Sequence, residues 1–378
     1  MSEYQYYEFQ AIDRPLSEKE QAEVGSYSSR SEVTPTRAVF TYNYSDFRGD
    51  PLKILQKYFD AMLYLTNWGS KQLTFRLPRA LVDAKALASY CYPDLISTSL
   101  TKDHVILDIY FHDEEGGSWV EGEGWLSSLA MLRRDILLGD YRALYLAWLK
   151  AISIEEGREE HKDLPEPPVP AGLKKLSAPL KSFVDFFEID ANLVAVAAEA
   201  SVKNQGVVES DWEQQIAKLS EQERLAFLVK FAQGDSQVNV QLLKRLKELA
   251  PEQQERSASS LPLRRKAVEL LTAAAARFDQ RKKLENQKAE RARTKQLNAM
   301  AQQEPEKWKQ VFNLIKTKQT NAYDKAVKLL TELRELAQHF GRSEQYESRL
   351  GQIQQEFSNL PGLKFRLQQA GLVKEKSD

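Results

Sequence analysis

The sequence predicts an α+β protein, in which a small mixed sheet with covering helices at the N-terminus precedes an all-α bundle or solenoid-like region. Three observations lead to this prediction. Segments with the two-residue periodicity of strands alternate with segments of helical periodicity over the first 150 residues. Of the 15 tyrosines, 13 lie before residue 150, where aromatic side chains suit a pleated surface. Beyond residue 171 the apolar residues recur only at helical spacing.

The strands and helices of the N-terminal half can be assigned in order. Ser17-Glu-Lys-Glu20 has the form of a capping box, in which a hydroxyl is followed three residues later by a carboxylate. Two more segments of this form occur later in the chain, Ser210-Asp-Trp-Glu213 and Ser220-Glu-Gln-Glu223. Asp50-Pro51 combines an N-cap carboxylate with a proline in the first turn. We expect the helix that it opens to carry Leu55, Tyr58, Phe59, Met62 and Leu63 on one face. The predicted strands are 4–11, 36–44, 71–77 and 104–111, and further helices are expected over 79–90, 125–138 and 141–152.

Changes in composition divide the chain into five parts. Residues 155–171 combine dense charge with four prolines, which indicates an exposed linker stiffened by polyproline-like stretches. One long basic helix is expected over residues 262–300, and short amphipathic helices follow it. The expected divisions are an α+β domain at 1–154, the linker at 155–171, a helical region at 172–250, the long basic helix within 251–300, and a helical bundle at 301–378.

The net charge of −1 conceals an asymmetry along the chain. Residues 1–200 hold 21 Lys+Arg and 31 Asp+Glu, a balance of −10. The remainder holds 32 basic and 23 acidic residues, a balance of +9. Residues 256–300 alone carry 12 basic and 4 acidic residues, so most of the C-terminal excess lies in one segment.

Several classes of protein are excluded or disfavoured. Cys91 is the one cysteine, which excludes an intramolecular disulfide and an all-cysteine metal site. The N-terminus lacks the pattern of a secretory signal, and no apolar stretch approaches the roughly 20 residues of a membrane span. We therefore expect a cytoplasmic protein that does not enter a membrane. The sequence contains no P-loop, nucleophile elbow or zinc-protease motif, and we predict no catalytic, cofactor-binding or metal-binding residues.

Two sets of motifs carry resemblances to bacterial proteins. The first set is Tyr4-Gln-Tyr-Tyr-Glu-Phe9, Ile12-Asp-Arg-Pro-Leu16, Tyr58-Phe-Asp-Ala-Met-Leu63 and Asn67-Trp-Gly69, and the second, in the tail, is Ala326-Val-Lys-Leu-Leu330, Arg349-Leu350 and Ala370-Gly-Leu372. The first set resembles a family of uncharacterised bacterial proteins over roughly residues 1–200, and that family brings no established activity. The tail is similar to the helical C-terminal tails of bacterial SWIM-type zinc-finger proteins. Because one cysteine cannot supply their zinc signature, the resemblance implies the helical scaffold but neither the zinc nor its nucleic-acid role, and it also implies a role as a partner of SWIM-type proteins.

Three further features each have a functional and a structural interpretation. The acidic loop at 113–123, with His104 and His112, offers ligands for Ca²⁺ or Mg²⁺, but it lacks EF-hand spacing, which favours a solvated loop. Cys91 stands between two tyrosines, where a small buried hydrophobe is a more common role than a nucleophile. The tyrosines could stack on bases, yet cross-strand packing explains them without a ligand in an acidic half. These tyrosines are Tyr4, Tyr6, Tyr7, Tyr42 and Tyr44.

The basic segment carries the main functional hypothesis. Its cations could neutralise phosphates, or they could contact an acidic protein surface, including this chain's own N-terminal half. The third alternative is a solvated helix face. We expect a non-enzymatic protein-interaction or adaptor component that acts through helical faces, with nucleic-acid association through residues 262–295 as the alternative. The candidate contacts are Arg264, Arg265, Lys266, Arg281, Lys282, Lys283, Lys288, Arg291, Arg293 and Lys295.

Overall fold

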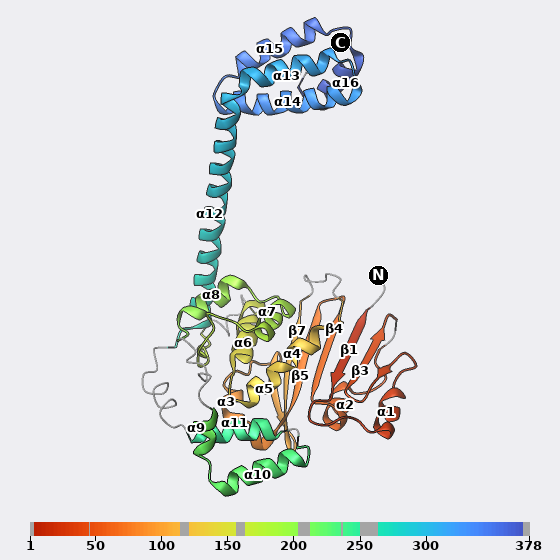
Figure 1. The fold of residues 1–378 in the computed structure, drawn as a ribbon, viewed down its shortest axis with the longest axis vertical. Helices are drawn as coiled ribbons and strands as arrows, with labels where there is room; N and C mark the ends of the chain where they lie inside the picture. The colour runs from red at the N-terminus through yellow and green to blue at the C-terminus, as the bar shows by residue number, and fades with distance from the viewer. Residues whose placement is uncertain are drawn as a thin grey trace. The chain divides into compact units, whose positions relative to one another are not determined.

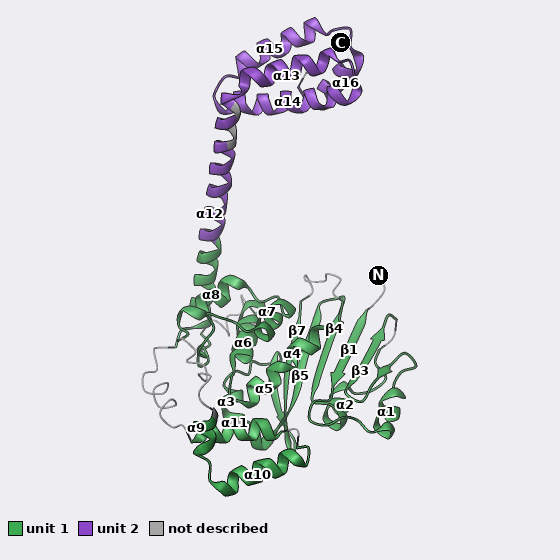
Figure 2. Cartoon of the chain, viewed as in Figure 1, with its two compact units in different colours: residues 1–278 green, residues 279–378 purple. Residues whose placement is uncertain are grey.

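The computed structural model describes residues 4–44, 46–113, 121–155, 163–202, 212–235, 237–249 and 264–372. Its N-terminal half contains a seven-stranded sheet and its C-terminal region is helical, so the predicted α+β class is confirmed (Figure 1). The chain divides into two compact units, residues 1–278 and 279–378 (Figure 2). The two units are described separately below.

The sheet has the order β2-β3-β1-β4-β5-β7-β6, and every pairing in it is antiparallel rather than mixed. The antiparallel arrangement follows from local connections such as the β4–β5 hairpin, in which Gly69 adopts a φ of +96°. A Cβ at Gly69 would lie 1.9 Å from the Asp113 carbonyl oxygen, so only glycine fits this turn. The strands are β1 (Gln5–Gln10), β2 (Glu32–Val33), β3 (Arg37–Tyr42), β4 (Ala61–Thr66), β5 (Ser70–Pro78), β6 (Ile96–Leu100) and β7 (His104–His112).

The helices of the first unit begin largely where the capping signals predict. The capping boxes at Ser17 and Ser220 and the Asp50 cap with Pro51 are all present, whereas the candidate box at 210–213 begins outside the described residues. The helices, with the short 3-10 turn η1, are α1 (Glu18–Gly25), α2 (Pro51–Tyr58), η1 (Arg79–Leu81), α3 (Ala84–Ala88), α4 (Trp125–Leu129), α5 (Met131–Leu137), α6 (Arg142–Ile154), α7 (Ala178–Phe186), α8 (Ala191–Glu199), α9 (Trp212–Ala217), α10 (Glu221–Ala232) and α11 (Val238–Glu248).

The prediction that Phe59, Met62 and Leu63 belong to a helix is wrong. The helix that begins at Asp50 ends at Tyr58, and residues 61–66 form β4 in the middle of the sheet. Most β4 side chains are buried on both faces of the sheet, so their sequence is a nearly continuous apolar run. Such a run lacks the two-residue alternation that distinguishes a strand from a helix.

Two apolar cores lie on the two faces of the sheet. On one face, Leu63, Leu73, Phe75 and Leu107 pack with buried residues of α4 to α8. On the other, Phe9, Phe40 and Met62 pack with α1 and α2. Figure 1 shows α4 and α5 in front of β5 and β7, and α1 and α2 close to β1 and β3. The tyrosines alternate accordingly, with Tyr6 in the first core and Tyr7 and Tyr42 in the second.

The first unit continues past the expected linker. Residues 156–162 lie outside the described residues, but Leu164 and Val169 pack against the first core. The Glu166 N–H donates to the Arg265 carbonyl at 2.8 Å, and the Ala267 N–H donates to the Leu164 carbonyl at 3.0 Å. This bridge joins residues about 100 positions apart. Helices α7 and α8, which follow the expected linker, share a core with the sheet, and the five-part division stays a prediction.

The second unit begins within α12 (Ala267–Gln302), which agrees closely with the long basic helix expected over 262–300. The following helices form a bundle around Val311, Ile315, Leu330 and Ile353, as predicted for the C-terminal part. These helices are α13 (Glu304–Lys316), α14 (Thr320–His339), α15 (Ser343–Glu356) and α16 (Pro361–Gln369).

Candidate functional site

The basic residues at the start of the segment are part of the fold of the first unit. Arg265 donates from Nε and Nη2 to the carboxylate of Glu166, at 2.9 and 2.7 Å. Glu166 is buried and also accepts a hydrogen bond from the Tyr145 hydroxyl. Burial, together with the Glu166 carboxylate, raises the pKa of Tyr145, so its hydroxyl keeps its proton and acts as a donor. Arg265 therefore forms an ion pair with Glu166 that is part of the fold.

Lys266 and Arg264, the neighbours of Arg265, are both exposed. The Lys266 ammonium lies 2.6 Å from the Asp163 carboxylate, and both side chains reach solvent, so this pair adds little stability. Arg265 and Lys266 therefore meet acidic groups of the chain's own first unit, one of the alternatives that the sequence left open.

The other seven candidate cations lie on α12 and are all exposed. Arg281 lies 3.7 Å from Glu285 one turn along the helix, and Arg293 lies 3.5 Å from Glu335 on α14. Every residue from 281 to 293 is exposed, whichever side of the helix it occupies. The structure thus separates the ten predicted residues into three at the first unit and seven along an uncovered helix.

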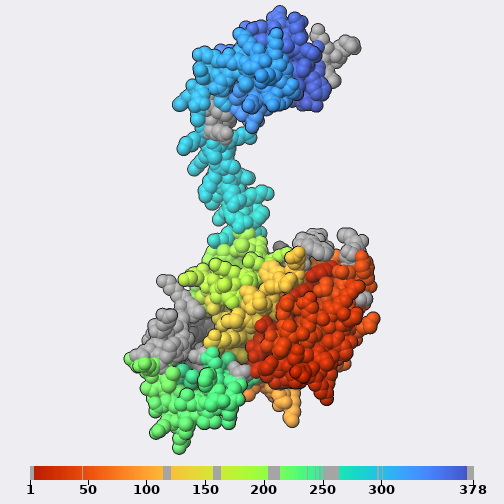
Figure 3. All heavy atoms as spheres, turned by 45° about the vertical axis from the view of Figure 1, so that its right-hand side comes forward, coloured from red at the N-terminus to blue at the C-terminus, as the bar shows by residue number. Residues whose placement is uncertain are grey.

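A second exposed surface lies on α10, in the first unit. Its large apolar side chains are open to solvent: Leu225 is 62% exposed, Leu228 65%, Val229 46% and Phe231 73%. The opposite side of α10 faces α11, because Arg245 of α11 contacts Glu223 at 2.9 Å and Lys230 donates to Gln241. In Figure 3 the light-green atoms of α10 lie at the surface of this unit. We call Leu225, Leu228, Val229 and Phe231 the α10 patch.

Sequence reasoning did not single out the α10 patch. Leu225, Leu228 and Val229 follow the i, i+3, i+4 spacing that normally marks the buried side of an amphipathic helix. The same spacing results when the side is kept open for another molecule. Only the three-dimensional structure distinguishes the two cases.

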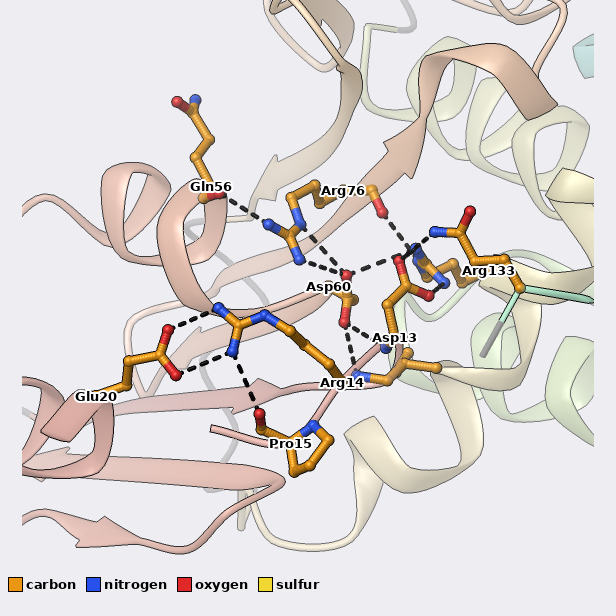
Figure 4. A network of polar contacts seen from close by, with 10 residues as sticks. Asp13, Arg14, Pro15, Glu20, Gln56, Asp60, Arg76 and Arg133 are labelled. Atoms are coloured by element: carbon orange, nitrogen blue, oxygen red, sulfur yellow. Dashed lines mark hydrogen bonds and ion pairs between the residues drawn. The ribbon is translucent and has the colours of Figure 1, made fainter. Parts of the chain in front are cut away.

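A buried ion network links the strand ends of the sheet to α5 and α11 (Figure 4). Arg133 donates to both carboxylate oxygens of Asp13, at 2.9 and 2.7 Å, and Arg76 donates to Asp60 at 2.8 Å. Asp60 also accepts the backbone N–H groups of residues 12 and 13. Gln237, just before α11, donates to Asp13 at 2.9 Å. The network therefore fastens the α10–α11 hairpin to the sheet.

This network is suited to structure rather than to chemistry. Asp60 is 1% exposed and Arg133 4%, so neither offers a surface that a substrate could touch. Burial alone would raise the pKa of Asp60, but the Arg133 and Arg76 guanidinium groups outweigh it and hold that pKa below its ordinary value. Two carboxylates face two guanidinium groups, which leaves the cluster neutral.

For two other ionisable groups in the first unit, Asp108 and Lys150, the effect of burial on the pKa outweighs that of the neighbouring groups. Burial raises the pKa of Asp108, which accepts hydrogen bonds from Gln72 and Thr74. Burial lowers the pKa of Lys150 on α6, whose ammonium lies 3.4 Å from the Glu188 carbonyl oxygen. Both groups lose solvation on folding and so cost stability at neutral pH.

The remaining candidates from the sequence can be placed in the fold. His104 and His112 begin and end β7, so about 26 Å of strand separates them and they cannot share one ion. Most of the acidic loop at 113–123 lies outside the described residues, so the solvated loop that we expect there stays a prediction. Burial raises the pKa of the Cys91 thiol, the opposite of nucleophile activation. Tyr7 and Tyr42 pack edge to face across the strands, as the structural interpretation predicted.

Neither a membrane span nor a metal site is found in the described parts of the chain. None of the described helices combines the length and apolar character needed to cross a bilayer. The described residues also contain no group of three or more His, Cys, Asp or Glu side chains placed to hold a metal ion. No protein-family model, curated protein or solved structure matches this chain. Evidence for its function therefore comes from the surfaces of the chain itself.

Proposed function

We propose that this protein is a non-enzymatic interaction component, an adaptor of the bacterial cytoplasm, that docks on a protein partner through the α10 patch. The observation that carries the proposal is the exposure of four large apolar side chains on a helix whose other side is occupied by α11. An exposed apolar patch of this kind on a folded unit is typical of a protein-interaction surface. A partner that covers these side chains gains their burial in addition to shape complementarity.

The contacts that hold the α10–α11 hairpin in place do not involve the side chains of the α10 patch. Gln237 fastens α11 to Asp13 through the buried network, and Arg245 links α11 to α10. The patch therefore lies on a supported helix, and a partner does not have to order it on binding. The resemblance of residues 326–372 to SWIM-type tails makes a SWIM-type protein the first partner to test.

The proposal is tested by recovering partners of the tagged full-length chain from a bacterial lysate and identifying them by mass spectrometry. The double variant Leu228→Gln, Phe231→Gln should lose a defined partner that the wild type retains. A matched control, Leu100→Gln with Phe365→Gln, removes one leucine and one phenylalanine that are 59% and 58% exposed elsewhere. Retention of the same partners by both double variants would contradict the proposal.

A second function, nucleic-acid association, is favoured by a different observation. Seven exposed cations lie on α12 between residues 281 and 295, in the second unit, whereas the α10 patch belongs to the first.

A further inference from the structure

Four cations of α12 share one side of the helix. At about 100° of rotation per residue, Arg281, Lys288, Arg291 and Lys295 fall within roughly 80° of arc. We call these four residues the basic stripe. All four are exposed, and all lie in the second unit.

The other side of α12 is different in charge and in surroundings. Glu290 and Asp279 project from the side opposite the stripe, by the same rotation. Arg293 reaches Glu335 of α14, which places the neighbouring bundle about 150° round the helix from the stripe. The stripe therefore faces away from both the acids at 279 and 290 and the bundle of its own unit.

A helix that serves only as a solvated spacer would be expected to interleave its charges on every side. Here, Glu285 is the acid nearest the stripe, and it pairs with Arg281 at 3.7 Å. An exposed pair at this distance adds little stability. Within the described residues, no ion pair or side-chain hydrogen bond accounts for the positions of Lys288, Arg291 and Lys295.

We infer that the basic stripe binds the phosphate backbone of double-stranded nucleic acid without reading its sequence. The stripe extends over 15 residues, or about 21 Å from the first to the last, a length along which a duplex presents about six phosphates per strand. Four cations at this spacing can each meet a separate phosphate. Residues 281–295 contain no aromatic side chain to stack on unpaired bases, which favours a duplex over a single strand.

The first test measures the salt dependence of binding. Full-length protein is titrated into a fluorescent 20-base-pair DNA duplex of random sequence, and anisotropy is followed between 50 and 200 mM KCl. Four phosphate contacts predict a slope of about −3.6 for the logarithm of affinity against that of salt concentration. Affinity should therefore fall by about 150-fold across this range. The single strand of the same length should bind more weakly.

The second test distinguishes an effect of the side of α12 on which the cations lie from an effect of the total charge of the helix. The triple variant Lys288→Gln, Arg291→Gln, Lys295→Gln removes three stripe cations. The control Lys282→Gln, Lys283→Gln, Arg293→Gln removes two lysines and one arginine from other sides of α12. Glutamine maintains helix propensity in both variants. The stripe variant should retain about one contact and a salt response of only about four-fold, whereas the control should retain most of the wild-type response.

Three outcomes would overturn the inference. They are undetectable binding of wild type to the duplex at 50 mM KCl, equal losses in the two triple variants, and a salt response below ten-fold in the wild type. Loss of the protein partner by the stripe variant, with no effect on duplex binding, would assign these cations to an acidic protein surface instead. The α10 double variant should bind the duplex as the wild type does, so failure of either proposal can be recognised separately.

Discussion

The charged residues of the first unit and those of α12 have different roles, although both come from ordinary Asp, Glu, Lys and Arg side chains. In the first unit, Arg133 and Arg265 are paired with the buried carboxylates of Asp60 and Glu166, which belong to distant segments. Along α12 the cations between 281 and 295 are exposed. Arg265 and Arg281 lie only sixteen positions apart in the same basic segment. The identity of a residue and the charge of its segment therefore do not decide its role.

What separates the two regions is the apolar pattern around the charges. Ala267, Leu270, Leu271 and Ala274 follow i, i+3, i+4 and i+7 spacing, and they pack into the first core. The stretch from 281 to 295 contains one large apolar residue, Leu284, which is exposed. Burial of the apolar positions brings Arg265 to Glu166, whereas without such positions a charged helix stays in solvent. Where basic residues lie next to an apolar pattern with helical spacing, a role in the fold should be tested before a role in binding.

Substitution of Asp60 should show the largest effect. Asp60→Asn leaves the Arg76 and Arg133 guanidinium groups without one of their carboxylates, so the free energy of unfolding of the first unit should fall by about 4 kcal/mol. Because the folded-state pKa of Asp60 is lowered, its contribution is present above the ordinary aspartate pKa of about 4 and disappears as pH falls below it. Chemical denaturation of both proteins between pH 3 and pH 7 measures the difference.

The control for this pH dependence is Asp108→Asn. Burial raises the folded-state pKa of Asp108, so the wild type gains stability relative to this variant as pH falls. The two variants should therefore show opposite slopes against pH. Equal slopes would contradict the contrast between a paired and an unpaired buried carboxylate.

Substitution of Arg265 should have the next largest effect. Arg265→Ala leaves the buried Glu166 with only the Tyr145 hydroxyl, and the first unit should lose about 3 kcal/mol. Lys288→Ala, on the exposed side of α12, should change stability by less than about 0.5 kcal/mol. Urea denaturation followed by tyrosine and tryptophan fluorescence compares them. Similar losses in the free energy of unfolding would contradict the difference between a structural Arg265 and a solvent-exposed Lys288.

Lys150→Met should stabilise the first unit by about 1 kcal/mol at pH 7, because methionine fills the space of a poorly solvated ammonium. The folded-state pKa of Lys150 is lowered, so the charged form costs stability below that pKa. The gain should shrink as pH rises toward the ordinary lysine pKa of about 10.4. Thermal unfolding at pH 7 and pH 10 measures it, and a variant less stable than the wild type at pH 7 would show that Lys150 forms a favourable contact.

The smallest effect concerns two alanines of α12. Ala274→Gly removes a buried methyl group and increases the backbone entropy of the unfolded chain, so the free energy of unfolding of the first unit should fall by about 1 kcal/mol. Ala289→Gly carries the same helix penalty at an exposed position, so the unfolding of both units should stay unchanged while the helical circular dichroism signal falls slightly. A loss of unit stability from Ala289→Gly would indicate packing around the exposed stretch.

Local signals in the sequence predicted much of the fold. Capping at Ser17, Asp50 and Ser220, and alternation in four of the strands, depend on neighbouring residues and were confirmed. β4 was missed because its burial on both faces removes alternation, and β6 because it is a short edge strand with polar side chains. The continuity of the first unit past residue 155 depends on a bridge to residues 265–267, which no local pattern encodes.

The candidate surfaces were predicted less completely. Charge counting identified α12, but it could not separate Arg265 from Lys288, since their difference lies in a partner 99 residues away. The α10 patch was not predicted at all, because an open apolar side and a buried one have the same spacing. Pairing across long sequence separations and the covering of helix sides are properties of the assembled chain.

The most direct test of this account is hydrogen exchange along α12, measured by mass spectrometry on the full-length chain. Amides of residues 267–274 should be protected nearly as strongly as those of the sheet, because they exchange only when the first unit unfolds. Amides of residues 281–293 should exchange much faster, since no tertiary packing opposes local opening, and should gain protection on addition of duplex. Uniform strong protection across α12, or a gain confined to residues 267–274, would contradict the account.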